Sequence, residues 1–272
     1  MKKSFLILIA LLCALVCLFG CGADPTPTEP PTEASTAPTE TDATTVPTEP
    51  ETTTEPTEPE PTKPEHSEFY IPELSVDDVI LYFNEVCLDA EFINSGNPTL
   101  IQRWDEVVYY TIDGDPTEDD LAVLNTFCTW LNTIEGFPGI QESTHPKDTN
   151  LRIFFCDQER MIDLLGDNFY GMDGGVTFWY NHSNQIYSST ICYLNSTSQF
   201  VRNSVILEEI YNGLGPVQDT DLRTDSIIYA GYSEPQALTP VDELILKLLY
   251  HPSIQCGMNA QECEEMIRQL YY

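Results

Sequence analysis

The chain has 272 residues, and its 44 Asp and Glu residues outnumber its 11 Lys and Arg residues to give a formal net charge of −33. From residue 67 to the end there are 33 acidic and eight basic residues, a net charge of −25. Binding to phosphate requires a basic surface, which eight scattered cations do not build. We therefore exclude nucleic acid as a partner and expect basic or neutral ligands to bind more readily than acidic ones.

The first 21 residues are typical of an export signal. Lys2 and Lys3 precede an apolar run that ends at Phe19 and is too short to span a bilayer with ease. The end of the run, Leu18-Phe19-Gly20-Cys21, resembles the lipobox of bacterial lipoproteins. That resemblance implies a signal peptide over 1–21, a lipid on Cys21, and a position on the extracytoplasmic face of the bacterial cell membrane. An uncleaved anchor, or an ordinary signal that contains a cysteine, is the alternative.

Residues 22–66 repeat the sequence Pro-Thr-Glu-Pro at 27–30, 47–50 and 56–59, and they almost lack large apolar side chains. Such a segment cannot bury a core, so we predict a disordered linker. Thr residues of this segment are candidates for glycosylation. The composition changes near Phe69, and we assign residues 67–272 to one globular domain, which is an ordinary size for a single core.

Within this domain, apolar spacing predicts strands interleaved with helices. The first helix begins after Ser75 and keeps apolar residues at helical spacing up to Ala90. Thr117 and Asp120 resemble a capping box at the start of the next helix. The full set comprises strands at 107–112, 150–156, 176–180 and 186–194, and further helices at 117–134, 158–165, 199–214, 240–250 and 259–271. The strands at 176–180 and 186–194 are expected to form a hairpin. This pattern indicates an α+β fold with a mixed sheet and a helical C-terminal part.

The domain contains six cysteines, at 87, 128, 156, 192, 256 and 263. An exported chain can oxidise them into three bridges, with fifteen possible pairings. Only Cys256 with Cys263 is suggested by sequence proximity. Burial of the remaining cysteines as small apolar side chains is the alternative.

Two short patterns resemble catalytic or metal sites at first reading. The acidic run Asp113–Asp120 lacks the glycine and the final Glu of a calcium-binding loop, so we favour a turn followed by an acidic helix start. His182 and Cys192 form a possible thiol-imidazole pair, but we expect an exposed loop histidine and a cysteine buried in a strand.

The segment Leu207–Asp219 resembles a family of bacterial lipoproteins defined as domain of unknown function 2927. The resemblance covers much of residues 75–271 and also rests on Asp225-Ser-Ile-Ile-Tyr229, Leu238-Thr-Pro-Val-Asp242, Leu248-Leu-Tyr250 and Cys256-Gly-Met258. It implies membership of that family and supplies no catalytic residues.

A second resemblance is to the zinc peptidases called metzincins, whose active-site helix carries HExxHxxGxxH. That spacing places Glu208 and Asn212 at the first two ligands, Glu209 at the general base, Gly215 at the turn and Gln218 at the third ligand. The spacing is kept, but the imidazoles are replaced by one carboxylate and two amides. The resemblance therefore implies a degenerate zincin-like core.

One carboxylate and two amides hold zinc poorly, so we expect no zinc and no other cofactor. Without zinc, Glu209 has no activated water to deprotonate. Calcium, bound with help from Asp219 and Asp221, is the alternative metal. The leading hypothesis is a non-catalytic, lipid-anchored domain that binds an extracellular ligand or protein. A hydrolase that uses Glu209 with an atypical metal site is the competing hypothesis.

Overall fold

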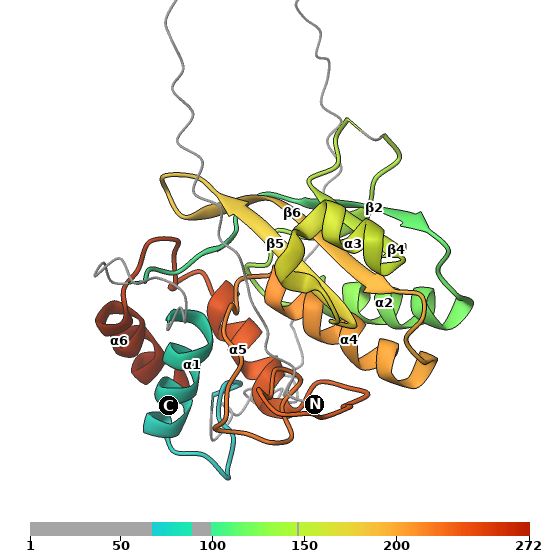
Figure 1. Ribbon diagram of the computed structural model, residues 1–272. Coiled ribbons are helices and arrows are strands. Elements are labelled where there is room, and N and C mark those ends of the chain that lie inside the picture. The colour runs from blue at the N-terminus through green and yellow to red at the C-terminus, as the bar shows by residue number, and fades with distance from the viewer. Residues whose placement is uncertain (1–66, 89–98, 146) are drawn as a thin grey trace, which may run out of the picture. The chain divides into compact units, whose positions relative to one another are not determined.

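The computed structural model describes residues 67–88, 99–145 and 147–272 (Figure 1). The predicted signal peptide, the predicted lipidation site Cys21, the predicted linker and the end of the first predicted helix at Ala90 lie outside the described residues. In the described part of the chain, no helix has the length and apolar character needed to cross a membrane.

A six-stranded mixed sheet forms the centre of the domain. Its strands run in the order β1-β6-β4-β2-β3, and β5 pairs with β6. Every pairing is parallel except that of β5 with β6, which is antiparallel. The strands are β1 (Arg103–Trp104), β2 (Val108–Gly114), β3 (Ile140–Glu142), β4 (Leu151–Cys156), β5 (Gly174–Tyr180) and β6 (Gln185–Leu194).

Helices cover both faces of this sheet, because the central strands alternate apolar side chains toward each face. Ile191 and Tyr193 of β6 belong to the main core, whereas Cys192 and Leu194 join a smaller cluster beneath α3. In Figure 1, α2 and α4 lie on one face and α3 lies on the other. The three helices are α2 (Glu118–Leu131), α3 (Gln158–Leu165) and α4 (Gln199–Gly213).

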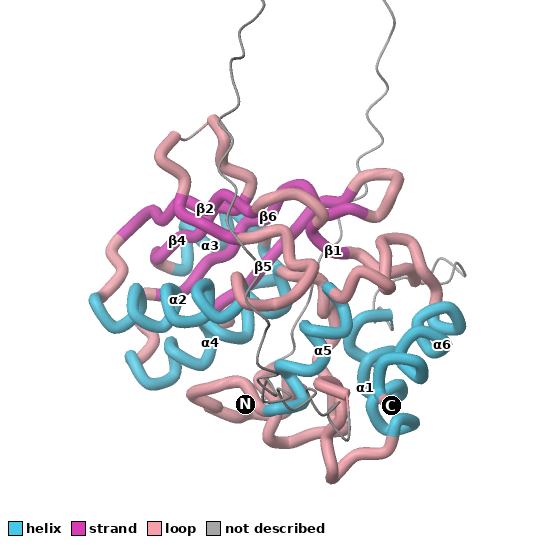
Figure 2. Tube along the Cα trace, turned by 180° about the vertical axis from the view of Figure 1, so that it is seen from behind, coloured by secondary structure: helices cyan, strands magenta, loops and turns pink. Residues whose placement is uncertain are grey.

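Three further helices pack together beside the sheet, as Figure 2 shows from behind. They are α1 (Val76–Leu88), α5 (Pro240–Tyr250) and α6 (Ala260–Tyr271). The start of the domain is fixed to α6, since Ser67 Oγ donates to the Tyr271 carbonyl at 2.8 Å. The Tyr271 hydroxyl donates to the carbonyls of Ile71 and Leu74 at 2.9 and 2.6 Å. The segment that enters the domain from the predicted linker is therefore held against its last helix.

The predicted mixed α/β character is confirmed, and most predicted elements lie within a few residues of their expected bounds. The capping box is confirmed, because Thr117 Oγ1 accepts from the Asp120 backbone while Asp120 Oδ2 accepts from the Thr117 backbone. The hairpin of β5 and β6 is also confirmed. The sequence reading missed β1 and β3, which have two and three residues and are too short for a periodic pattern. It also did not predict that most of the sheet is parallel.

Candidate functional site

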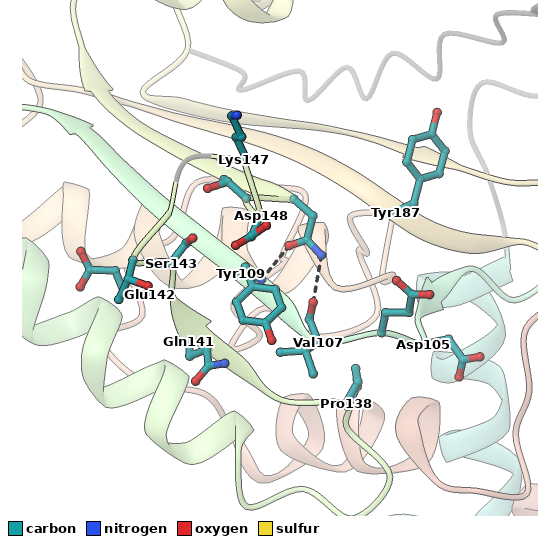
Figure 3. A pocket seen from close by; sticks show the side chains of 14 residues that line it. Asp105, Val107, Tyr109, Pro138, Gln141, Glu142, Ser143, Lys147, Asp148 and Tyr187 are labelled. Atoms are coloured by element: carbon teal, nitrogen blue, oxygen red, sulfur yellow. Dashed lines mark hydrogen bonds between the residues drawn. The ribbon is translucent and has the colours of Figure 1, made fainter. Parts of the chain in front are cut away.

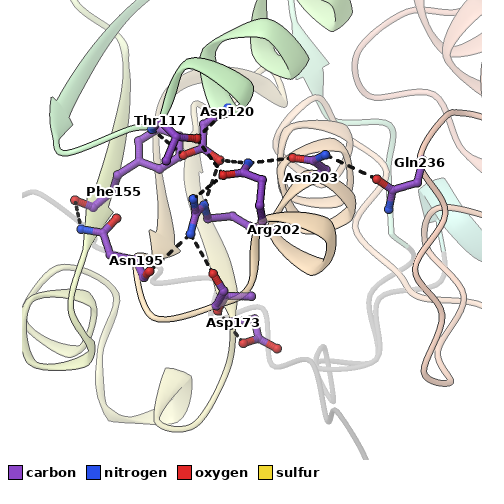
Figure 4. A network of polar contacts seen from close by, with 10 residues as sticks. Thr117, Asp120, Phe155, Asp173, Asn195, Arg202, Asn203 and Gln236 are labelled. Carbon is purple, nitrogen blue, oxygen red and sulfur yellow. Dashed lines mark hydrogen bonds and ion pairs between the residues drawn. The ribbon is translucent and has the colours of Figure 1, made fainter.

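Helix α4 carries three of the predicted site residues, and a buried polar network fixes its first turn (Figure 4). Arg202 Nε lies 2.8 Å from Asp120 Oδ1 at the start of α2, with side-chain exposures of 6% and 0%. Gln199 also donates to Asp120 at 2.7 Å, and Arg202 donates to the Thr197 carbonyl at 2.8 Å. The network joins the starts of the two helices that cover this face of the sheet.

The environment of Asp120 favours its charged form. Burial by itself raises the pKa of Asp120, but hydrogen bonds from Arg202, Thr117 and Gln199 outweigh it and leave the pKa below its usual value. The ion pair is therefore intact at neutral pH, and it holds the start of α4 against the start of α2.

The far end of α4 is fixed by bonds to carbonyls that a helix end leaves unpaired. Trp104 Nε1 donates to the Gly213 carbonyl at 2.9 Å, and the Tyr250 hydroxyl donates to the Leu214 carbonyl at 2.7 Å. Gly215 then turns the chain at φ +130°, where a Cβ atom would meet the Gln102 carbonyl at 2.4 Å. A glycine is needed at this turn both for its backbone angle and for space.

Glu209 and Asn212 are fully buried on α4, three residues apart, while Glu208 is half-buried. The Glu209 side chain packs against Gly174 at the start of β5, where an added Cβ would lie 3.1 Å from its carboxylate. Both amide atoms of Asn212 are buried and make no hydrogen bond to any described residue. Position 212 therefore places a donor and an acceptor inside the domain.

The charge of Glu209 acts on two neighbours across the helix-sheet interface. Burial, followed by the negative charge of Glu209, raises the pKa of Tyr193 well above its ordinary value. The pKa of the Cys192 thiol is raised by its hydrogen bond with Cys156, by burial and, to a smaller extent, by Glu209. Glu209 thus lies near the carboxyl end of β6, in an environment of low polarity.

Gln218 and Asp219 belong to a different segment from α4. After Gly215 the chain runs along the end of α1, where the backbone amides of Val217 and Gln218 both donate to the Val86 carbonyl. Both Gln218 and Asp219 are half-buried, and Thr220 beside them donates to Glu85 at 2.5 Å. The structure therefore brings Glu208, Glu209 and Asn212 together on one helix and places Gln218 and Asp219 against α1. In the described part of the chain, no group of three or more His, Cys, Asp or Glu residues is arranged to hold a metal ion.

A second buried network was not foreseen, although its residues lie in two of the motifs that carried the family resemblance. Asp242, fully buried in the first turn of α5, accepts from Ser226 Oγ at 2.7 Å and from the Ile227 amide at 3.2 Å. It also accepts from Thr239 Oγ1 and the Thr239 amide at 2.8 and 2.9 Å. Tyr82 of α1 completes the network by donating to Ser226 at 2.7 Å. These bonds fix the turn at 226–228 against α1 and α5.

The structure agrees with the interpretations favoured for the acidic run at 113–120 and for His182 with Cys192. The acidic run from Asp113 forms the end of β2, a turn and the capping box of α2. His182 is exposed in the turn of the hairpin, whereas Cys192 is fully buried near the other end of β6. These two residues do not form a thiol-imidazole pair.

All six cysteines of the domain are free thiols in the structure. Cys263 is fully buried on α6. Burial, followed by the neighbouring Cys263, raises the pKa of Cys87 of α1, so the structure brings together two cysteines that the sequence did not connect. Cys256 instead contacts the Arg103 carbonyl, with 3.7 Å between its sulfur and the oxygen. A bridge between Cys256 and Cys263 stays a prediction.

A pocket of about 1010 Å³ opens where β2, β4 and β6 begin, at the end of the sheet opposite to Glu209 (Figure 3). Its floor is fixed by Asn150, whose side chain accepts from the Tyr109 amide at 2.7 Å and donates to the Val107 carbonyl at 2.9 Å. Tyr109 and Tyr187 contribute aromatic rings. Carboxylates outnumber cations in the lining, which includes Asp105, Glu106, Glu142, Asp148 and Lys147.

The pocket is separate from the predicted site on α4. Glu209 contacts Gly174, which pairs with Tyr193 one residue before β6 ends, whereas the pocket contains Tyr187 near the start of β6. No pattern in the sequence indicates this pocket, because its residues come from short segments that the fold brings together. Its excess of carboxylates makes the potential in the pocket more favourable to cations than to anions.

Fold and site together define a mixed α/β domain whose helix α4 carries buried polar side chains. The model of the family described as "Protein of unknown function (DUF2927)" matches residues 77–269. The chain therefore belongs to this family, as the motifs between 207 and 258 implied. No curated protein matches the chain.

Proposed function

We propose that this protein is a lipid-anchored extracytoplasmic binding protein whose domain recognises a neutral or basic ligand at the α4 face without catalysis. One observation carries the proposal: Asn212 is fully buried, and neither atom of its amide is hydrogen-bonded to a described residue. A buried polar group left unsatisfied costs about 1–3 kcal/mol. A ligand that supplies both an acceptor and a donor at this position would satisfy the amide and recover that cost.

The chemistry of the site favours a ligand with both donors and acceptors. An amide donates and accepts, so Asn212 suits a peptide group or a hydroxyl-rich molecule. The nearby carboxylate of Glu209 disfavours acidic ligands, as does the net charge of −25 on residues 67–272.

The scaffold we propose is related to the zinc peptidases but has lost their metal. Support comes from the helix α4, which follows an antiparallel hairpin and keeps the ligand spacing up to the glycine turn at Gly215. The donors at 208, 212 and 218 are a carboxylate and two amides, which are weak zinc ligands. Tight, stoichiometric zinc uptake by the purified protein would refute this part of the proposal.

The central test substitutes Asn212 with Leu, which has a similar size and no polar atoms. If the amide is kept for a ligand, the ligand-free N212L protein gains about 1–2 kcal/mol in free energy of unfolding, because the unsatisfied group is removed. Asn132 is the comparison variant, since its amide makes two hydrogen bonds with Ile140, at 2.8 and 2.9 Å, and the residue itself is exposed. N132L should lose about 1 kcal/mol, because bonds are lost and water satisfies the groups left behind. Equal losses in both variants would show that Asn212 has a structural role.

The anchor is tested separately. Cells that express the full chain and are fed radiolabelled palmitate should label the wild type and fail to label Cys21→Ala. A labelled C21A protein would reject lipidation at this residue.

The competing hydrolase hypothesis is tested at Glu209. It requires a measurable peptidase activity that Glu209→Gln abolishes while the folded state is kept.

A further inference from the structure

We propose that Cys156 and Cys192 form a disulfide that joins β4 to β6 at the carboxyl end of the central strands. The two cysteines are far apart in the sequence, and the tertiary structure alone brings them together. This pair is independent of the α4 face and of the predicted pairing of Cys256 with Cys263.

The sheet register places both thiols on one face of neighbouring strands. Phe154 pairs with Cys192 and Cys156 pairs with Leu194, so the two cysteines are diagonal neighbours. Both belong to the small apolar cluster beneath α3, and each thiol is near enough to act on the pKa of the other.

Closing the bridge requires a small movement that the end of β4 can make. Parallel strands lie about 4.8 Å apart and rise about 3.3 Å per residue, so diagonal neighbours two residues out of step have Cα atoms about 8 Å apart, whereas a disulfide requires about 4.4–6.8 Å. Cys156 is the last residue of β4, and the chain leaves the strand at Asp157 to begin α3. A shift of about 1.5 Å at this strand end satisfies the limit without changing the register.

The surroundings also favour reaction at Cys156 first. The hydrogen bond from Cys192 lowers the pKa of Cys156 and outweighs burial and the negative charge of Asp157, which raise it; the positive charge of Arg160 also lowers it. Cys156 is 9% exposed, whereas Cys192 is fully buried. The thiolate, which is the nucleophile in disulfide exchange, is therefore favoured at the more accessible cysteine.

The oxidant we propose is a disulfide of the extracytoplasmic space, either a small molecule or a thiol-disulfide oxidoreductase. The Cys156 thiolate attacks one sulfur of this disulfide, forms a mixed disulfide and expels the first thiolate, which takes a proton. Cys192 then loses its proton and attacks the Cys156 sulfur, which expels the second thiol. In total, two cysteine thiols are oxidised and one external disulfide is reduced to two thiols.

The bridge would fix the sheet where two helices begin. The chain enters α3 directly after Cys156, and Asn195 near the start of α4 donates to the Phe155 carbonyl at 3.3 Å. A cross-link that encloses the segment 156–192 restricts the unfolded chain, so the oxidised protein should melt about 5 °C or more above the reduced protein.

The test uses the full-length chain, purified in detergent under reducing conditions and then incubated with oxidised glutathione. Because the oxidant is supplied, the result does not depend on whether the protein is exported. Free thiols are blocked with one alkylating reagent under denaturing conditions, the sample is reduced, and the released thiols are labelled with a second reagent. Mass spectrometry of the peptides should find the second label on Cys156 and Cys192, and a linked peptide should appear before reduction.

Single variants complete the test. Cys156→Ser and Cys192→Ser should each abolish the difference in melting temperature between oxidised and reduced protein. Cys128→Ser is the control, since Cys128 is also buried but lies on α2, and it should keep that difference. Detection of Cys156 and Cys192 as free thiols after oxidation, or of either one linked to another cysteine, would overturn the proposal.

Discussion

The strongest test of the fold is removal of the Asp242 carboxylate. Its hydrogen bonds join α1, α5 and the turn at 226–228. Substitution by Ala removes the acceptor of two buried donors, the hydroxyl of Ser226 and the amide of Ile227. Each donor left unsatisfied costs about 1–3 kcal/mol. Loss of the two bonds with Thr239 removes the side-chain half of the capping box, while the residue-242 amide still donates to Thr239 Oγ1, and adds up to about 1 kcal/mol.

We therefore expect Asp242→Ala to lower the free energy of unfolding by about 4 kcal/mol, a large share of the 5–15 kcal/mol typical of a domain. Denaturation in urea at 25 °C, followed by tryptophan fluorescence, measures this difference. The slope against urea should be unchanged, which shows that the same surface is exposed on unfolding.

The matched control is Glu262, which occupies the same position in the capping box of α6. It accepts one bond from the Asn259 amide, at 2.9 Å, and it is exposed. Glu262→Ala should cost at most about 1 kcal/mol, because water satisfies the groups it leaves. A loss in Asp242→Ala no larger than that of the control would show that the buried network does not stabilise the fold.

Two further predictions concern α4. Gly174→Ala places a Cβ 2.3 Å from Val205 Cγ1 and should lower the free energy of unfolding by about 1–3 kcal/mol. Gly213→Ala meets nothing closer than 3.4 Å and should be neutral or slightly stabilising. Equal effects of the two substitutions in urea denaturation would contradict the described contact between β5 and α4. Arg202→Met leaves Asp120 buried without its cation and should cost about 3–5 kcal/mol at pH 7. Because the pKa of Asp120 is lowered on folding, its contribution is complete above about pH 4, the unfolded value, and is lost as the pH falls through the lower folded value. The gap between wild type and Arg202→Met should therefore narrow in acid, and a gap independent of pH would refute the role assigned to the ion pair.

Short-range signals in the sequence predicted most elements of this fold. The start of α2 could be read from Thr117 and Asp120, because a capping box involves residues only three apart. The start of α5 carries the same signal in Thr239 and Asp242, and Pro240 occupies a first-turn position that tolerates it. The sequence also placed Glu208, Glu209 and Asn212 on one helix, because residues four apart on a helix share a face.

Contacts across the sheet could not be read in this way. The proximity of Cys156 to Cys192 depends on the parallel register of β4 and β6, which connects residues 36 positions apart. The second role of Asp242, holding the turn at Ser226, likewise depends on how α5 packs against α1. Periodicity predicts which face of an element is buried, but it does not predict which element covers that face.

By itself, then, the sequence determined the membership of the family, the positions of most helices and strands, and the acidic character of the domain. It also predicted an export signal. These properties depend on composition and on residues close together in the chain. Only the tertiary structure decided that Asn212 is buried, that Gln218 and Asp219 lie against α1, and that a pocket lined by carboxylates opens at the amino end of the sheet. Each of these depends on long-range packing, in which the burial of a side chain is set by residues distant in the sequence.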